Sequence, residues 1–167
     1  MNINILKLKN APGDTIQFDV TNDLASISFG GQEINFVGPV HVTGEISYQN
    51  NIFSVKGAAR AEVQTTCVNC LEPYKQKLSA QLEEKYASVE IQNKDDESEI
   101  HNFTGDLIDI RPEVMKALLM ELPMRLVCSE DCQGLCSQCG INLNHNRCDC
   151  QGDNIDPRLA ILKKLQQ

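Results

Sequence analysis

Eight cysteines in four close pairs are the residues of this 167-residue chain whose type and spacing could do chemistry. A spacer of two residues lets both sulfur atoms of one turn face the same ion, and zinc prefers four such ligands in a tetrahedron. Gly140 directly follows one pair and can take the positive φ that such a turn often needs. The pairs are Cys67 and Cys70, Cys128 and Cys132, Cys136 and Cys139, and Cys148 and Cys150.

The third and fourth pairs fit one compact site, because residues 136–150 span only 15 positions. The first and second pairs then form the other site, which would join the strand-rich half of the chain to the end of a later helix. That site closes a loop of more than 50 residues between Cys70 and Cys128. A site closed by four cysteines has no open coordination position, so we expect two structural Zn²⁺ ions and no enzyme activity.

Other uses of the cysteines stay open at this point. The thiols could be buried and free, could form disulfides, or could hold one zinc ion instead of two. A thiol–disulfide redox pair at Cys67 and Cys70 would open a helix after a strand, and Pro73 could begin such a helix. His145 lies among the last cysteines and could replace one of them as a ligand.

The charge and hydropathy of the chain limit its partners. The net charge is −8, and general nucleic-acid binding requires many contacts from Lys and Arg to phosphates, so we expect no general RNA or DNA binder. A local basic patch or a basic protein partner remains compatible with this charge. No apolar run is long enough to span a membrane, and no export signal begins the sequence. We therefore expect a cytoplasmic protein with reduced thiols and without membrane association.

Outside the cysteines, the sequence contains no pattern typical of a catalytic or binding site. His41 and His101 have no partner pattern in the sequence, so we assign them no function. The chain has no phosphate-binding loop, no nucleophile elbow and no HExxH helix, so we expect no small-molecule substrate.

The hydrophobic pattern predicts an α+β fold. We expect an antiparallel, β-rich N-terminal half followed by a helix, a cysteine-rich zinc-knuckle segment and a short C-terminal helix. Alternating apolar residues, with period two, indicate the strands. The ranges with this pattern are Asn2–Leu8, Thr15–Val20, Glu33–Val37, Val40–Tyr48, Ile52–Thr65 and, more ambiguously, Tyr74–Val89.

The pattern also predicts how the chain divides. Residues 1–127 form a β-rich core domain with a helix near 110–122, which Asp109 caps and which has Pro112 in its first turn. Residues 92–102 are a charged loop. Residues 128–167 contain the cysteine-rich segment and a C-terminal helix that packs on the core. Asp156 is the expected cap of that last helix, and its apolar face is formed by Leu159, Ile161, Leu162 and Leu165.

Four passages of the chain, in this order, resemble one known family. They are Cys67-Val-Asn-Cys-Leu-Glu-Pro73, Asp106-Leu-Ile-Asp-Ile110, Gly134-Leu-Cys-Ser-Gln-Cys-Gly-Ile-Asn-Leu-Asn144 and Asp156-Pro-Arg-Leu-Ala160. They resemble the YceD family, the large ribosomal RNA subunit accumulation proteins. The resemblance implies a bacterial or plastid factor without known catalysis. Some members keep the first cysteine pair and lack the last cluster, which supports the grouping above and makes the last cluster an accessory.

The resemblance implies a noncatalytic factor for accumulation of large-subunit (23S) ribosomal RNA and for ribosome assembly. Its partner would be preribosomal large-subunit RNA or a basic large-subunit ribosomal protein. The alternative is a redox protein, or a redox or zinc sensor, that uses Cys67 and Cys70. Direct RNA contact would need a patch drawn from basic residues such as Arg60, Lys75, Lys77, Arg147 and Arg158, which the sequence does not place on one face.

Overall fold

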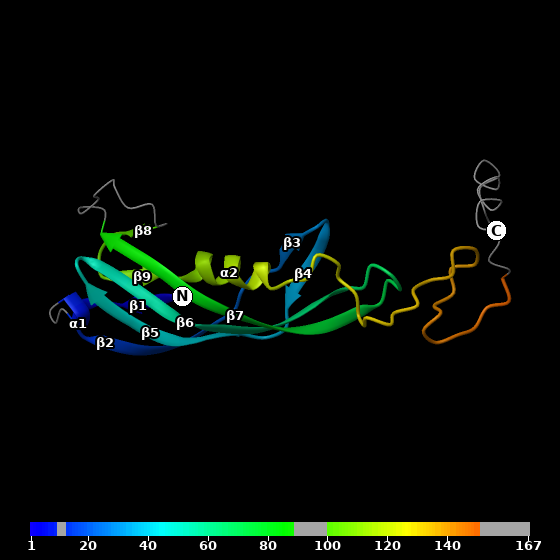
Figure 1. Cartoon of the computed structure of the whole chain (residues 1–167), viewed down its shortest axis with the longest axis horizontal. Coiled ribbons are helices and arrows are strands. Elements are labelled where there is room, and N and C mark those ends of the chain that lie inside the picture. Colours follow the sequence, from blue (N-terminus) through cyan, green and yellow to red (C-terminus); the bar gives the residue numbers. More distant parts are fainter. Residues whose placement is uncertain (10–12, 89–99, 151–167) are drawn as a thin grey trace, which may run out of the picture.

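The computed structural model describes residues 1–9, 13–88 and 100–150 (Figure 1). Within these ranges the chain is β-rich, with antiparallel sheets and two helices. The strands are β1 (Asn2–Asn4), β2 (Thr15–Asn22), β3 (Ile27–Phe29), β4 (Gln32–Phe36), β5 (Val40–Gln49), β6 (Ile52–Thr66), β7 (Pro73–Ser88), β8 (Ile100–Phe103) and β9 (Leu107–Asp109). The helices are α1 (Leu6–Lys9) and α2 (Arg111–Met120). The C-terminal helix expected from Asp156 onward lies outside the described residues.

The long hairpin of β6 and β7 organises the main sheet. Its register runs from Ile52 opposite Ala87 to Thr66 opposite Pro73. The other edge of β6 pairs first with β5 and then with β4, which gives the order β2-β5-β6-β4-β3. On the far edge, β8 pairs with β7 in parallel, while β1 and β9 form a separate two-stranded antiparallel sheet.

Alternation along β6 and β7 explains why the main sheet has one buried face. On β7 the apolar residues Leu78, Ala80 and Leu82 are buried, as their spacing predicted, and the residues between them are exposed. Such alternation is typical of an antiparallel sheet with one face in the core and one in water. The buried residues of β6 are Phe53, Val55, Ala59, Ala61, Val63 and Thr65.

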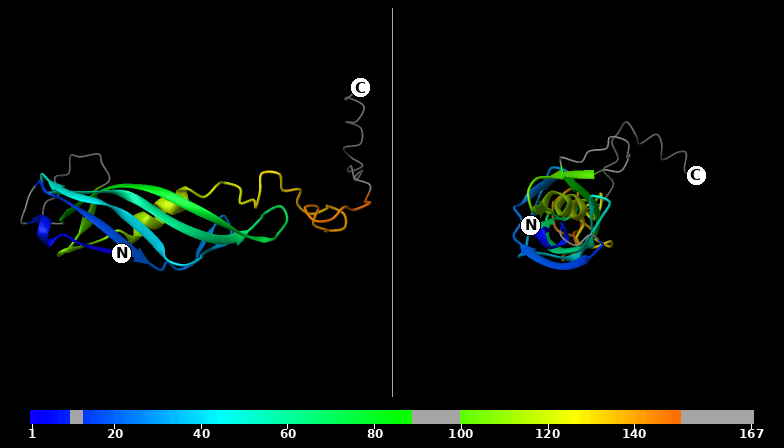
Figure 2. Two further views of the ribbon diagram at one scale, coloured as in Figure 1. Left: turned by 90° about the horizontal axis from the view of Figure 1, so that it is seen from below. Right: turned by 90° about the vertical axis from the view of Figure 1, so that its left-hand side faces the viewer.

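Helix α2 fills the concave side of this sheet. In the end-on view of Figure 2 the strands curve around the helix, and α2 packs against β6 and β7. Val114 and Leu118 of α2 are fully buried in the shared core. After α2 the chain leaves this body and runs past the tip of the β6–β7 hairpin, which brings the cysteine-rich segment to that end (Figure 1). No helix in the described ranges is long and apolar enough to cross a membrane.

The strand expected over Asn2–Leu8 is wrong after Asn4. Residues Leu6–Lys9 instead form the short helix α1, with a hydrogen bond from the Lys9 amide to the Ile5 carbonyl of 3.0 Å. The side chain of Asn4 accepts a hydrogen bond from the Leu6 amide at 3.0 Å, which satisfies one of the free backbone N–H groups at the start of the helix. Ile5 and Leu8 are both fully buried. Because they are three residues apart, a helical turn places both side chains on the side that faces the core, and a strand would not.

The start of α2 differs from its prediction by one residue. Ile110, not Asp109, occupies the cap position, and Pro112 lies in the first turn as predicted. The Asp109 carboxylate accepts a hydrogen bond from the Arg111 amide and pairs with the N-terminal ammonium of Met1, both at 3.0 Å. Asp109 therefore fastens the chain N-terminus to the beginning of the helix.

The prediction of a loop over residues 92–102 is wrong for its last three residues, which belong to β8. His101 of this strand lies between two carboxylates. Its Nε2 atom is 3.0 Å from Glu84 of β7, and its Nδ1 atom is 3.3 Å from Glu113 of α2. His101 thus links the edge strand to both the sheet and the helix, a role that no local sequence pattern indicates.

Gly44 of β5 and Gly57 of β6 lie opposite each other, where the two backbones approach too closely for a side chain. A Cβ atom on Gly44 would lie 2.2 Å from the Lys56 carbonyl oxygen. We expect Gly44→Ala to lower the free energy of unfolding by about 1–3 kcal/mol, the usual cost of overpacking. Chemical denaturation would measure it, with Thr43→Val on the exposed side of β5 as the control. Equal stability of both variants would contradict this prediction.

Candidate metal centres

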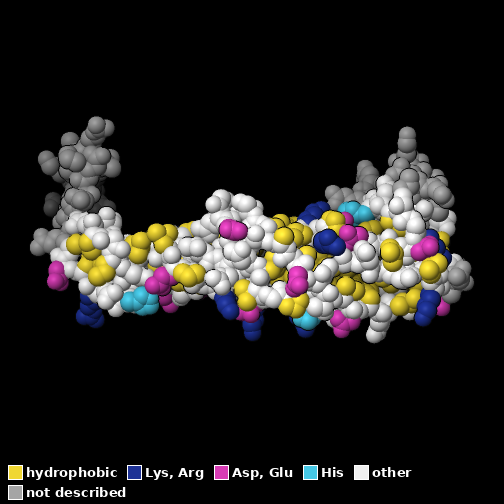
Figure 3. All heavy atoms as spheres, turned by 180° about the vertical axis from the view of Figure 1, so that it is seen from behind, with side chains coloured by type: hydrophobic (Ala, Val, Ile, Leu, Met, Phe, Trp, Pro, Cys, Tyr) yellow, Lys and Arg dark blue, Asp and Glu magenta, His cyan; other side chains and the backbone are white. Residues whose placement is uncertain are grey.

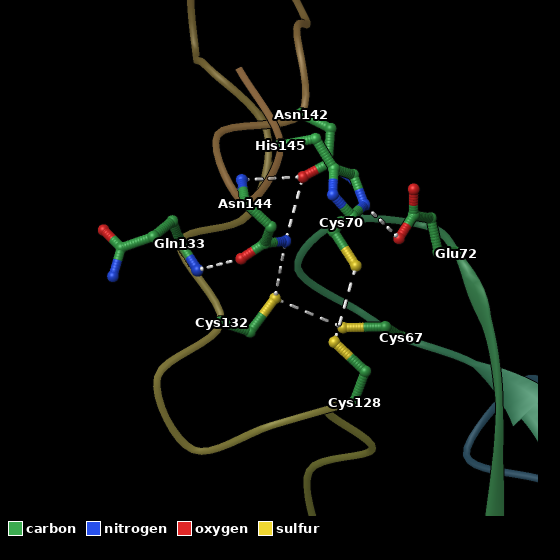
Figure 4. A network of polar contacts seen from close by, with 9 residues as sticks. All are labelled: Cys67, Cys70, Glu72, Cys128, Cys132, Gln133, Asn142, Asn144 and His145. Carbon is green, nitrogen blue, oxygen red and sulfur yellow. Dashed lines mark hydrogen bonds and ion pairs between the residues drawn. The ribbon is translucent and has the colours of Figure 1, made fainter. Parts of the chain in front are cut away.

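The first cysteine group lies where the main hairpin meets the chain that follows α2. Cys67 and Cys70 occupy the turn between β6 and β7, and Cys128 and Cys132 follow the helix. The four sulfur atoms all lie within 4.8 Å of one another. The Sγ atoms of Cys67 and Cys132 are 3.8 Å apart, and those of Cys70 and Cys128 are 3.7 Å apart (Figure 4).

These sulfur separations fit metal ligands better than disulfides. A tetrahedron of sulfur atoms with zinc–sulfur bonds of about 2.3 Å has edges of about 3.8 Å. A disulfide would require about 2.05 Å between sulfur atoms, and all eight cysteines are free. The first group therefore has the chemistry and the dimensions of a four-thiolate metal centre.

The second group, which the sequence spacing placed together, also lies together. The sulfur atoms of Cys136, Cys139, Cys148 and Cys150 are all within 4.8 Å of one another. An isolated β-bridge between Leu135 and Asn142 closes the turn that carries the first two of these cysteines. That the eight residues bind metal remains a prediction.

The first turn, Cys67 to Glu72, has two backbone hydrogen bonds that fix its shape. The Leu71 amide donates to the Cys67 carbonyl at 3.0 Å, and the Cys67 amide donates to the Glu72 carbonyl at 2.9 Å. The turn from Cys136 repeats this pattern. There the Gly140 amide donates to the Cys136 carbonyl at 2.9 Å, and the Cys136 amide donates to the carbonyl five residues later at 2.8 Å. The two turns are thus the same knuckle.

The residue after the second cysteine has a positive φ in both knuckles. Gly140 has a φ of +72°, which confirms the prediction made for it, and Leu71 has a φ of +60°. A leucine in this region costs about 1–2 kcal/mol, which glycine avoids. The first knuckle is therefore held in shape by its surroundings. One of them is the hydrogen bond from the Val68 amide to the Leu126 carbonyl, at 2.9 Å.

Backbone amides stabilise one thiolate in each centre. Burial raises the pKa of Cys67, but the backbone N–H groups of Cys70, Cys128 and Asn69 lower it, to about 6. The same arrangement acts on Cys136, where the N–H groups of the next residues in the knuckle lower the thiol pKa to about 6. Both knuckles therefore aim backbone amides at the sulfur of their first cysteine.

The other thiols show the cost of crowding sulfur atoms. The hydrogen bond with Cys132 is the largest of the causes that raise the pKa of Cys128 to about 12. The hydrogen bond with Cys139, together with burial, raises the pKa of Cys150 to about 12. Four adjacent thiols cannot all ionise by themselves, whereas a bound divalent cation deprotonates its thiol ligands outright.

The two centres differ in the exposure of one cysteine pair. Cys67 and Cys70 are 0% and 3% exposed, whereas the other two cysteines of their centre are partly or fully exposed and the second centre has no buried cysteine. We expect an alkylating reagent, in the presence of a chelator, to modify the second centre before Cys67 and Cys70. Mass spectrometry of the cysteine peptides over time would measure the order. Fast modification of Cys67 and Cys70 without chelator would instead indicate a redox pair.

None of the three histidines belongs to either sulfur group among the described residues. His145, the alternative ligand, has its Nε2 atom 3.2 Å from a carboxylate oxygen of Glu72 (Figure 4). His41 is 3.0 Å from the hydroxyl of Thr21, and His101 lies between its two glutamates.

Three of the basic residues considered for RNA contact share one surface. Arg60, Lys75 and Lys77 are exposed on the outer face of the β6–β7 hairpin, where Arg60 is opposite Ser79. Glu62 lies directly opposite Lys77 and offsets part of this charge. Arg147 lies in the cysteine-rich segment, and Arg158 lies outside the described residues.

Comparison with known proteins decides the family. The sequence model of the family described as "Large ribosomal RNA subunit accumulation protein YceD" matches residues 55–166, two thirds of the chain, including all eight cysteines. The chain belongs to the YceD family. The match begins inside β6 and includes both cysteine pairs of each candidate metal centre. The part of the chain that matches the family therefore contains both centres.

Individual relatives extend this result. YlbN of Bacillus subtilis is 26% identical over 162 residues, which cover 96% of this chain and 94% of YlbN. An uncharacterized protein of Mycobacterium tuberculosis is 31% identical over 117 residues, 66% of this chain and 54% of that protein, so the chain spans about half the length of this YceD relative. The chloroplastic "Large ribosomal RNA subunit accumulation protein YCED homolog 1" of Arabidopsis thaliana is 32% identical over 60 residues, 36% of this chain and 19% of the homolog. No solved structure matches the chain.

Proposed function

We propose that this YceD protein is a noncatalytic, cytoplasmic factor that supports accumulation of 23S ribosomal RNA and ribosome assembly, and that it holds two structural Zn²⁺ ions. The proposal of zinc binding rests on the two groups of four cysteines. In each group all four sulfur atoms lie within 4.8 Å of one another. The family description supports the ribosomal half. The first centre ties the main hairpin to the chain after α2, so its metal would stabilise the fold.

Zinc is the metal that fits this donor set best. Four thiolates in a tetrahedron favour zinc or an iron–sulfur cluster, and separations of 3.7 and 3.8 Å match a single ion. We expect elemental analysis of protein purified without chelator to give two zinc ions per chain. A metal content near zero with all thiols free would refute the proposal, and iron in place of zinc would refute the assignment of the metal.

The redox alternative has one observation in its favour, the pKa of Cys67 near 6. Two others oppose it. A redox cysteine needs access to its partner, and the Cys67 side chain is fully buried. The residues after Cys70 lead into strand β7, not into a helix, so the pair lacks the helix N-terminus expected of such a motif. We therefore favour the structural role.

The charges of the described surface favour a selective partner. On the face shown in Figure 3, acidic and basic side chains are interspersed along the molecule. The basic residues Arg60, Lys75 and Lys77 form a small group beside Glu62. Preribosomal RNA contacted at this group, or a basic large-subunit ribosomal protein, would suit a chain with a net charge of −8.

Sedimentation of cell extracts would test the ribosomal role. We expect the protein to travel with large-subunit assembly intermediates and not with translating ribosomes. Crosslinking in those fractions would then identify the RNA or protein attached to it. Sedimentation only as free protein, under conditions that preserve assembly intermediates, would count against an assembly factor.

A further inference from the structure

Asn144 belongs to the loop between the cysteine pairs of the second centre, yet its side chain reaches the first centre. Its Nδ2 atom donates to the Sγ atom of Cys132 at 3.4 Å (Figure 4). The same atom donates to Asn142 at 2.9 Å, and the Oδ1 atom accepts a hydrogen bond from the Gln133 amide at 2.8 Å. Both ends of the amide are thus used, and one of them contacts a candidate metal ligand.

The backbone around Asn144 fastens the two centres to each other. The Leu143 amide donates to the Gly134 carbonyl at 2.9 Å, and the Leu135 amide donates to the carbonyl of Asn69 in the first knuckle at 3.1 Å. Gly134 has a φ of +72°, and a Cβ atom there would lie 3.0 Å from the Asn69 carbonyl oxygen. A glycine therefore permits the close approach of the two segments.

A hydrogen bond to a ligand sulfur stabilises its thiolate form and fixes its direction. Removal of a residue that hydrogen-bonds to a metal ligand commonly lowers the metal affinity by about 10–100-fold. Asn144 lies between Cys139 and Cys148, so a metal ion in the second centre would pin both ends of its loop. The loop would then be ordered before it contacts Cys132. This lowers the loss of conformational entropy when the contact forms.

We propose that Asn144 is a positioning residue that couples the two centres, so that metal in the second centre raises the affinity of the first. This inference rests on the proposed zinc binding. The coupling is reciprocal, since any linkage between two binding sites acts equally in both directions. It also assigns a role to the second centre, namely to complete the surroundings of Cys132 in the first centre.

The variant Asn144→Asp removes the two hydrogen bonds that the Nδ2 atom donates, to Cys132 and to Asn142. Aspartate keeps the oxygen that accepts from the Gln133 amide, but it lacks the N–H that donates to Cys132. Asn146→Asp is the matched control, because it adds the same charge to the same loop. The hydrogen bonds of the described residues include none from the Asn146 side chain.

Occupancy of the first centre can be measured separately in the full-length chain. Zinc–chelator buffers would fix the free Zn²⁺ concentration, and protection of Cys67 and Cys70 from alkylation would report the first centre. We expect Asn144→Asp to raise the free Zn²⁺ needed for half protection by about 10–100-fold. Asn146→Asp should need the same concentration as the unchanged chain. Equal protection in Asn144→Asp and Asn146→Asp would overturn the proposal.

A double-mutant cycle tests the coupling itself. Cys148→Ser with Cys150→Ser removes half the ligands of the second centre and should weaken the first centre to a similar degree. Adding Asn144→Asp to that background should have little further effect, because the loop is no longer held. If the two sets of substitutions lower the zinc affinity of the first centre by independent, additive amounts, the coupling is overturned, while both zinc sites remain in place. Absence of protection at every Zn²⁺ concentration in the unchanged chain would refute the zinc proposal and the coupling with it.

Discussion

Cys70→Ser is expected to unfold most of the protein, whereas Cys139→Ser is expected to loosen mainly residues 134–150. Cys70 is 3% exposed and closes the turn of the longest hairpin, so its centre holds the sheet to the chain that follows α2. A structural zinc ion contributes on the order of 10 kcal/mol in small peptides. This is comparable to the whole free energy of unfolding of a domain, about 5–15 kcal/mol.

Hydrogen exchange on both variants measures this difference. In Cys70→Ser we expect loss of protection along the whole of β6 and β7, including their ends distant from the turn that contains Cys70. In Cys139→Ser we expect these strands to stay protected and the cysteine-rich segment to exchange faster. The Asn144 link weakens the first centre in Cys139→Ser without emptying it. Equal loss of protection throughout both variants would mean that the ligands are shared between the centres differently.

The sequence was sufficient where a local pattern decides the structure. Period-two alternation located the long strands, including β7, because each buries one face against the same core. Cysteine spacing placed the sulfur atoms of 136–150 together, since a short segment leaves few alternatives. The grouping of the first four cysteines needed elimination as well as spacing, because a long stretch of chain separates its two pairs.

The sequence was insufficient where distant contacts decide. Alternation over Asn2–Leu8 was misleading, since burial of Ile5 and Leu8 together selects a helical turn. Strand β8 depends on parallel pairing with β7, which no local signal reports. Asn144 stood in a passage that carried the family resemblance, but its contact with Cys132 appears only when both centres are assembled.

Removal of this protein from its cell is expected to lower large-subunit ribosomal RNA relative to small-subunit RNA. The expectation follows from membership in the YceD family and from the proposed assembly role. Quantification of both RNAs in a clean deletion strain measures it. Re-expression of the unchanged chain should restore the ratio, whereas Cys70→Ser should not, because that variant loses the fold. An unchanged ratio in the deletion strain would count against the assembly role and favour the redox alternative.

The same cells can separate RNA contact from protein contact. A triple variant of Arg60, Lys75 and Lys77 to glutamine keeps every cysteine and removes three exposed positive charges from one face. If precursor RNA binds there, this variant should fail to restore the ratio although it folds and holds zinc. At a net charge of −8 the purified chain should bind random RNA poorly at physiological salt, because it releases few counterions. Restoration of the RNA ratio by the triple variant would instead indicate a basic ribosomal protein as the partner. Tight binding of the purified chain to every RNA alike would contradict the charge argument.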